Sequence, residues 1–209
     1  MGLSCRQLAS KRGHERLFSG VSFALAPGEA IWVQGDNGSG KTTLLRQLCG
    51  LALPERGTVC WQGQPISAVR ADYHASLLYI GHADGLKGDL LAWENLLLGP
   101  HGQGRPQQAA LDALAAMGLS NQAARPVRLL SQGQRKRVAL ARLLLAEQQA
   151  VWILDEPFSA LDQPSTATLR ATLAQHRARG GMLVLTTHQD PELPGLQLLR
   201  LGQSGEAAC

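Results

Sequence analysis

The residue types best suited to chemistry lie in one short glycine-rich segment. Residues 35–42 fit the pattern G-x-x-x-x-G-K-[ST] of a phosphate-binding loop, with Thr43 directly behind: Gly35, Asp36, Asn37, Gly38, Ser39, Gly40, Lys41 and Thr42. Glycines let backbone N–H groups approach a polyphosphate closely, and the helix expected to start here attracts the anion through its dipole. We expect Lys41 to add a charge for the outer phosphates and Thr42 to offer its hydroxyl to Mg²⁺. The segment therefore predicts a nucleotide site.

Two carboxylates follow a wholly apolar run later in the chain. Val151–Leu154 are typical of a strand buried on both faces, and Asp155 and Glu156 come directly after them. Ligands of open parallel sheets sit at the carboxyl ends of the strands. We therefore expect Asp155 to hold Mg²⁺ beside Thr42, and Glu156 to polarise or deprotonate an attacking water. Such a pair is also often a helix cap or a solvated turn, and its combination with Lys41 is what favours catalysis.

A third segment, Leu130–Gln134, precedes a strongly helical stretch over Arg135–Glu147. Ser131 has the residue type of a helix N-cap, and a helix start is also an anion site. Three cations crowd the first turns of this helix, where the dipole disfavours positive charge: Arg135, Lys136 and Arg137. A nearby phosphate would explain the pattern, while simple solvation of the side chains is the alternative.

The elements that must position these residues follow from the apolar pattern and the turn residues. Strands are expected at Val21–Ala26, Glu29–Gln34, Gly57–Gln62, Ser76–Ile80, Ala150–Leu154 and Met182–Thr187. The segment Leu91–Ala146 reads as mainly helical, with breaks at 99–106 and 118–128. This order predicts an α/β domain with a parallel-sheet core. Its core lobe comprises about residues 1–81 and 148–209, and a helical subdomain comprises about residues 82–147.

Length and composition limit the class of protein. A chain of 209 residues suits a single domain, residues 1–209, with a core of its own. The net charge of +4 is spread along the chain, which argues against nucleic-acid binding. No apolar run approaches the ~20 residues needed to cross a bilayer, so any membrane attachment is expected through a partner. The cysteines lie far apart, which favours reduced thiols in a cytosolic protein over disulfides or a metal site: Cys5, Cys49, Cys60 and Cys209.

Taken together, the motifs resemble those of the ATP-binding cassette (ABC) ATPases over essentially the whole chain. They follow one another in the family's order: the phosphate loop, Leu130–Gln134, Asp155-Glu156, Ser159–Asp162 and His188. The resemblance implies a P-loop NTPase fold with a parallel-sheet core, an antiparallel β subdomain and a helical signature subdomain. It also implies that Asp162 belongs to the D-loop, and that His188 is the switch histidine, which contacts the outer phosphate and helps to orient the water.

The resemblance further implies ATP and Mg²⁺ as cofactors and a head-to-tail dimer as the active form. In such a dimer the signature residues of one copy cover the ATP held by the phosphate loop of the other: Ser131, Gln132, Gly133 and Gln134. ATP then joins the two copies, hydrolysis weakens their contact, and the opening is passed to membrane subunits. The implied catalytic residues are Lys41, Glu156 and His188, and a single copy is expected to hydrolyse ATP poorly.

Two positions depart from the family's pattern. Where the family has a glutamine after the strand 76–80, this chain has His82, and a neutral imidazole can still accept a hydrogen bond or bind a metal. We therefore predict that His82 takes the role of this glutamine near Mg²⁺ and at the transporter contact. The aromatic residue that stacks on adenine is also missing near Arg12–His14, which predicts loose selectivity between ATP and GTP.

Softer features indicate a subfamily: the short chain, Gly81-His82, Gly85-Leu86-Lys87, Leu91 and Glu94-Asn95-Leu96. They resemble the ATP-binding subunits of the bacterial cytochrome c maturation transporter, a family described as haem exporters. This resemblance implies a peripheral protein on the cytoplasmic face of the inner membrane, held by integral membrane subunits of the maturation system. The remaining histidines form no haem-binding motif and are interpreted as ordinary surface or core residues: His14, His74, His101 and His176.

Three alternatives stand beside this interpretation. The same enzyme could serve another small-molecule cargo, which only the partner would decide. A soluble ABC ATPase acting on ribosomes or DNA is a second alternative, although such relatives generally carry two cassettes or long inserted arms, and neither is seen in this sequence. A nucleotide-binding scaffold without turnover is the third, and the combination of Lys41, Asp155 and Glu156 argues against it.

Overall fold

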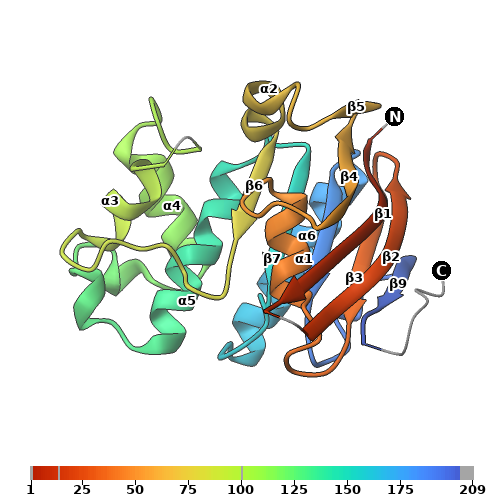
Figure 1. Cartoon of the computed structure of the whole chain (residues 1–209). Helices are drawn as coiled ribbons and strands as arrows, with labels where there is room; N and C mark the ends of the chain where they lie inside the picture. The colour runs from red at the N-terminus through yellow and green to blue at the C-terminus, as the bar shows by residue number, and fades with distance from the viewer. Residues whose placement is uncertain (1, 14, 100, 203–209) are drawn as a thin grey trace.

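Five parallel strands form the sheet that carries the predicted nucleotide site (Figure 1). The structure is a computed structural model that describes residues 2–13, 15–99 and 101–202. In the order in which they pair, the strands are β6 (Leu77–Ile80), β7 (Val151–Asp155), β8 (Met182–Thr186), β3 (Ala30–Gln34) and β9 (Leu196–Arg200). Strands from the two ends of the sequence therefore lie side by side, because β3 pairs with both β8 and β9.

A second, antiparallel sheet lies beside the first and is drawn in red and orange in Figure 1. Its strands pair in the order β2 (Glu15–Leu25), β1 (Leu3–Arg12), β4 (Arg56–Trp61) and β5 (Gln64–Pro65). Strand β1 is missing from the strands predicted by sequence, and β2 begins six residues before the predicted start at Val21, at Glu15. The alternation of β1 is broken between Cys5 and Leu8, where the register shifts and Gln7 has φ +50. Such a break removes the regular alternation of inward and outward residues by which a strand is recognised in a sequence.

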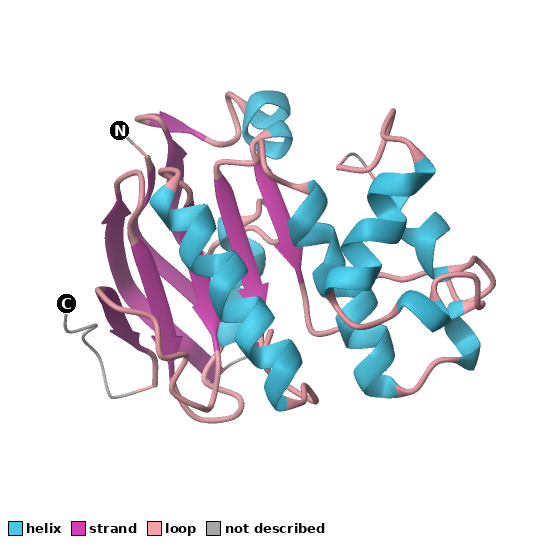
Figure 2. Ribbon diagram, turned by 180° about the vertical axis from the view of Figure 1, so that it is seen from behind, coloured by secondary structure: helices cyan, strands magenta, loops and turns pink. Residues whose placement is uncertain are grey.

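The helices cover the parallel sheet and form a separate lobe beside it (Figures 1 and 2). They are α1 (Lys41–Leu48), α2 (Arg70–Ala75), α3 (Ala92–Leu97), α4 (Gln107–Ala116), α5 (Gln132–Ala141) and α6 (Gln163–Ala178), with short 3₁₀ turns at Ser120–Gln122, Val127–Leu129 and Arg142–Leu145. Helices α3, α4 and α5 pack on one another and make up the lobe on the left of Figure 1. Helix α5 begins three residues before the predicted Arg135 and turns into a 3₁₀ turn after Ala141, so the expected helix over 135–147 is shorter.

The core has two parts, one on each face of the parallel sheet. Alternate residues of β7 point to opposite faces: Val151 and Ile153 pack with α1 and the antiparallel sheet, whereas Trp152 and Leu154 pack with the helical lobe and α6. Both faces are covered, and for this reason the strand is apolar throughout. The α/β fold with a parallel core, an antiparallel sheet and a helical lobe confirms the predicted fold class.

Candidate functional site

The phosphate-loop segment joins β3 to α1 at the carboxyl end of the parallel sheet. Gly40 stands at the N-cap of α1 with φ +96, a left-handed conformation that favours glycine. A Cβ atom at this position would lie 2.9 Å from the Phe18 ring and 3.0 Å from the Leu17 side chain. The β1–β2 hairpin therefore packs directly against the loop. Lys41 donates hydrogen bonds from Nζ to the carbonyl oxygens of Gly35 (2.6 Å) and Asp36 (3.1 Å), which holds its charge at the loop.

The first carboxylate, Asp155, is buried and held by two hydroxyl groups. Thr42 donates to its Oδ2 atom at 2.7 Å, and Thr186 at the end of β8 donates to its Oδ1 atom at 2.7 Å. The phosphate loop, strand β7 and strand β8 therefore meet at the Asp155 carboxylate. Hydroxyl and carboxylate oxygens are the ligands that Mg²⁺ prefers, so Thr42 and Asp155 fit the predicted metal site.

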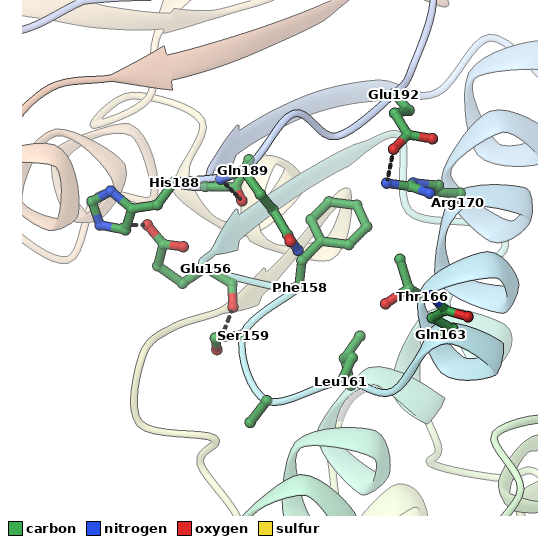
Figure 3. A pocket seen from close by; sticks show the side chains of 12 residues that line it. Glu156, Phe158, Ser159, Leu161, Gln163, Thr166, Arg170, His188, Gln189 and Glu192 are labelled. Atoms are coloured by element: carbon green, nitrogen blue, oxygen red, sulfur yellow. Dashed lines mark hydrogen bonds and ion pairs between the residues drawn. The ribbon is translucent and has the colours of Figure 1, made fainter.

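The second carboxylate, Glu156, points toward His188, as Figure 3 shows. Its Oε1 atom lies 3.4 Å from Nε2 of His188 and makes no hydrogen bond within the described part of the chain. Its backbone has φ +49, and its N–H donates to the Thr186 hydroxyl at 2.9 Å. A non-glycine residue in this conformation is strained, which is a frequent property of functional positions. The buried oxygen keeps a lone pair for a hydrogen-bond donor such as water.

His188 stands between two cavities. One, of about 770 Å³, is the pocket of Figure 3 and is lined by Glu156, Phe158 and residues of α6. The other, of about 270 Å³, is lined by Gly35 and Asp36 of the phosphate loop. The histidine therefore reaches both the loop and the second carboxylate. These predicted site residues share one edge of the sheet: the phosphate loop, Asp155, Glu156 and His188.

The segment Leu130–Gln134 lies at the start of α5, where Ser131 is the N-cap. The Ser131 hydroxyl accepts from the Gln134 N–H at 3.2 Å, and the Gln134 side chain accepts from the Ser131 N–H at 2.9 Å. This capping box leaves the hydroxyl hydrogen of Ser131 to be donated elsewhere. Among the described residues, no hydrogen bond or ion pair joins Ser131–Gln134 to residues 35–43 of the same chain.

The start of α5 contacts the predicted D-loop segment, Ser159–Asp162, of its own chain. A Cβ atom at Gly133 would lie 2.9 Å from the Ala160 carbonyl oxygen, and Arg137 lies 3.8 Å from Asp162. Asp162 caps α6 by accepting from the Ser165 N–H at 2.9 Å. Hydrogen bonding from the Ser165 side chain, and then from its backbone N–H, lowers the pKa of Asp162. The contact between signature and D-loop could not be read from the sequence.

The three cations of α5 have different surroundings. Arg135 is exposed, Lys136 is buried with its Nζ atom 3.8 Å from Asp84, and Arg137 pairs with Asp162 and donates to the Met117 carbonyl oxygen. Acidic partners within the chain therefore account for Lys136 and Arg137. Only Arg135 is exposed and fits the prediction of a cation that binds a phosphate or is simply solvated.

Two predicted positions remain without a contact that tests them. His82 follows β6 at the same sheet edge as Asp155 and is exposed. Its role beside Mg²⁺ stays a prediction. Arg12 at the end of β1 is exposed as well, whereas His14 lies outside the described residues.

The sequence search missed Thr186, which binds Asp155 through its hydroxyl and accepts from the Glu156 N–H. The signal available was a threonine at the carboxyl end of an apolar strand, two residues before His188.

The other polar residues form no metal centre that the structure reveals. Among the described residues, no group of three or more His, Cys, Asp or Glu side chains is placed to hold a metal ion. No disulfide joins Cys5, Cys49 or Cys60 within the described part of the chain, whereas Cys209 lies outside the described residues. His176 is buried and stacks on Trp152 with ring centroids 3.8 Å apart, as a core histidine does.

Comparison with known proteins gives concordant results. The ABC transporter family model matches residues 18–159. A cytochrome c biogenesis ATP-binding export protein CcmA of Aromatoleum aromaticum is 48% identical over 90% of this chain and 89% of its own. CcmA of Pseudomonas aeruginosa is 46% identical over 96% of this chain and 99% of its own, and CcmA of Escherichia coli strain UTI89 is 47% identical over 98% and 99%.

Solved structures share the fold at lower identity. The ATP-binding subunit of an ABC transporter superposes with a TM-score of 0.83 at 23% identity, covering 96% of this chain and 86% of its own. A dimeric ATP-binding cassette in a post-hydrolysis state, bound to ADP and Pi, superposes with a TM-score of 0.81 at 24% identity, covering 95% and 94%.

Proposed function

The chain belongs to the ABC transporter family and, within it, to the CcmA proteins, and on this premise we propose that it hydrolyses ATP to drive a haem exporter in the biogenesis of c-type cytochromes. The observation that carries the proposal is the junction at Asp155, whose two oxygens accept from Thr42 of the phosphate loop and Thr186 of β8. This contact ties the nucleotide loop to strand β7, which the catalytic candidate Glu156 directly follows. The CcmA relatives supply the transport role by their names.

The proposed chemistry is transfer of the outer phosphoryl group of ATP to water. The backbone N–H groups of residues 35–43 and the Lys41 ammonium bind the phosphates, and Thr42 and Asp155 hold Mg²⁺, which neutralises charge on the phosphate oxygens when bound. Glu156 accepts a hydrogen bond from the attacking water through its carboxylate. His188, beside that oxygen and beside the loop, orients the water and the outer phosphate.

The proposed active form contains two copies of the chain, head to tail. Ser131, Gln132, Gly133 and Gln134 of one copy would face the phosphates held by the other. The hydroxyl hydrogen of the capped Ser131, which the capping box does not use, supports this. So does the absence, among the described residues, of a hydrogen bond or ion pair between this segment and its own phosphate loop. The exposed Arg135 would add positive charge at the same helix start.

The proposed partners are integral membrane subunits of the cytochrome c maturation system, which would hold the protein at the cytoplasmic face of the inner membrane. In the part of the chain that the structure describes, no helix is long and apolar enough to cross a bilayer. Leu51 and Leu53, in the loop after α1, are exposed to 52% and 94%. Apolar side chains so exposed next to an apolar groove favour a docking surface. Helix α1 connects this surface to the phosphate loop.

The proposal is tested first on the purified protein. We expect Mg-ATP hydrolysis that E156Q reduces at least ~100-fold while ATP binding is retained, because the variant loses the acceptor for the water but keeps the phosphate loop. E147Q is the matched control, since Glu147 is an exposed glutamate that pairs with Arg179. Turnover by E156Q at the rate of E147Q would refute the catalytic role.

The transport role is tested in cells. Deletion of the gene, followed by a haem stain for covalent c-type cytochromes, should remove the stained bands. The wild-type gene and the E147Q variant should restore them, and E156Q should not. A normal complement of stained cytochromes in the deletion strain would refute the maturation role without affecting the ATPase assignment.

His82 and the base site add two narrower proposals. We propose that His82 acts in place of the family's glutamine, so that H82A lowers ATPase activity and its coupling to the membrane subunits. Unchanged values of both would contradict this. The stretch near Arg12–His14 has no aromatic residue where the family has one. We therefore expect GTP and ATP to be turned over at comparable rates, and a sharp preference for ATP would show that another contact reads the base.

A further inference from the structure

Lys136 is a buried cation in the first turns of α5. It is only 5% exposed, and its Nζ atom lies 3.8 Å from Oδ1 of Asp84, a buried oxygen that makes no hydrogen bond within the described chain. A buried ion pair held at this distance is costly, since desolvation outweighs a loose Coulomb contact. Replacement of both members of the pair by well-packed apolar side chains would cost less. Stability alone therefore does not explain why a lysine stands at position 136.

Asp84 belongs to the loop that follows β6 and contains His82. Beyond Asp84, the helical lobe holds this loop by two further side chains. Arg142 donates to the carbonyl oxygens of Asp84 (3.1 Å) and Gly85 (3.0 Å). The buried Asn95 of α3 bonds the backbone N–H of Lys87 at 2.7 Å and its carbonyl oxygen at 3.0 Å. The loop from residue 84 onward is thus fastened to the helical lobe, while Ile80 is fastened to the sheet.

Lys136 also interacts electrostatically with the carboxylates of the candidate active site. Burial lowers its pKa, and the negative charges of Asp84, Asp155 and Glu156 all act in the opposite direction. The ammonium therefore stands in the field of both site carboxylates as well as that of the loop aspartate. Its neighbours on the same helix do not share this position, since Arg135 is exposed and Arg137 turns to Asp162.

We propose that Lys136 is a positioning residue of the ATPase, which joins the loop after β6 to the signature helix through Asp84. The inference rests on the proposed ATP hydrolysis. Its consequence is that the helical lobe, and with it Ser131 and Gly133, keeps a defined placement relative to the catalytic carboxylate. Loss of the charge should slow the catalytic step rather than weaken nucleotide binding.

The test compares two ion pairs of the same loop. K136M and D84N each remove one charge from the buried pair with little change in volume. R128M and D89N do the same to the exposed control pair Arg128–Asp89, whose side chains are 58% and 91% exposed and whose atoms lie 2.8 Å apart. K136R restores the positive charge. The double variant D84N/K136M shows whether the effects of the two single changes are independent. For each full-length variant, kcat and KM for ATP are measured together with the midpoint of thermal unfolding.

We expect K136M and D84N to lower kcat about tenfold, with KM changed by less than about twofold. The double variant should be no slower than K136M, because both changes break one interaction. K136R should recover most of the rate, and R128M and D89N should match wild type. The midpoint of thermal unfolding should fall in K136M, because Asp84 is left charged without its partner, and it should recover in the double variant, which removes both charges. A positioning role predicts that the rate of the double variant stays low although its midpoint recovers, whereas a purely structural role predicts that the rate recovers together with the midpoint.

The proposal is overturned if K136M turns over ATP at the wild-type rate, if the effects of D84N and K136M multiply, or if the control pair has an equal effect. Should K136M fail to fold, D84N and K136R still decide the matter by the same criteria. Failure of the proposed function looks different, since then the wild-type protein itself would show no hydrolysis sensitive to E156Q.

Discussion

Thr186 holds both site carboxylates, so its replacement by valine is a sharp test of the site. T186V keeps the side-chain shape and removes two hydrogen bonds: one donated to the buried Asp155 at 2.7 Å, and one accepted from the Glu156 N–H at 2.9 Å. The threonine side chain is fully buried, so water cannot replace the lost partners without local opening. The change therefore acts on the site and on the stability of the fold at once.

The magnitude follows from the two bonds. A hydrogen bond to a charged group contributes about 2 kcal/mol, and a backbone N–H left without a partner costs about 1–2 kcal/mol. Burial of the added methyl group returns about 1 kcal/mol. We expect T186V to lower the free energy of unfolding by about 2–3 kcal/mol, a large share of the 5–15 kcal/mol typical of a domain. Since the backbone of Glu156 loses its anchor, kcat should fall at least ~10-fold.

The assay is urea unfolding at pH 7 with ATPase activity measured on the same samples. T172V is the matched control, because the buried Thr172 hydroxyl donates only to the Thr168 carbonyl oxygen within α6 (2.8 Å), and this variant should stay within about 1 kcal/mol of wild type. T186S retains the hydroxyl and should recover most of the activity. If T186V were as stable and as active as T172V, the reasoning that joins both carboxylates through Thr186 would be refuted.

Three further predictions concern other parts of the structure. Burial against Trp152 lowers the pKa of His176 to about 4. The fold therefore favours the neutral imidazole, and this contribution to stability is complete above pH 6.5 and decreases as the pH falls toward 4. Urea unfolding should show that the free energy of unfolding falls by about 2 kcal/mol between pH 7 and pH 5, and this fall should be absent in H176Q. Removal of the buried Asn95 amide in N95A should destabilise the protein by about 3 kcal/mol and speed amide hydrogen exchange over residues 87–91, whereas exchange at the wild-type rate would contradict the anchoring role. G40A combines a left-handed backbone with a contact at 2.9 Å to Phe18, so equilibrium titration should show at least ~10-fold weaker ATP binding, and unchanged affinity would count against the loop geometry.

Local chemistry is the part of this protein that the sequence predicts well. The phosphate loop is defined by neighbours in the chain, and Ser131 and Gln134 form their capping box within four residues. Strand β7 was recognised because burial on both faces demands apolar residues throughout. In each case the physical cause lies within a few residues, and a short window of sequence contains it.

What the sequence could not give depends on contacts between distant segments. Thr186 gains its role only because β8 pairs beside β7 and brings its hydroxyl to Asp155, 31 residues away in sequence. The cations of α5 looked alike in a helical pattern, yet Lys136 turns to Asp84 and Arg137 to Asp162. Strand β1 escaped prediction because its bulges break the alternation that a period-two search requires.

The D-loop segment carries a mechanical consequence for the proposed dimer. Its residues Ser159–Asp162 follow Glu156, whose carbonyl oxygen accepts from the Ser159 hydroxyl at 2.9 Å, and they end at Asp162, the cap of α6. In its middle, Ala160 has φ +58 and its carbonyl oxygen lies against Gly133 of the signature. With strained residues at both 156 and 160, the segment has few alternative conformations. In a head-to-tail dimer the signature would touch the partner's ATP while Glu156 acts on the chain's own. Movement of Glu156 during one hydrolysis event would therefore reach the other site through a rigid stretch of seven residues, 156–162, and the two sites should not turn over independently.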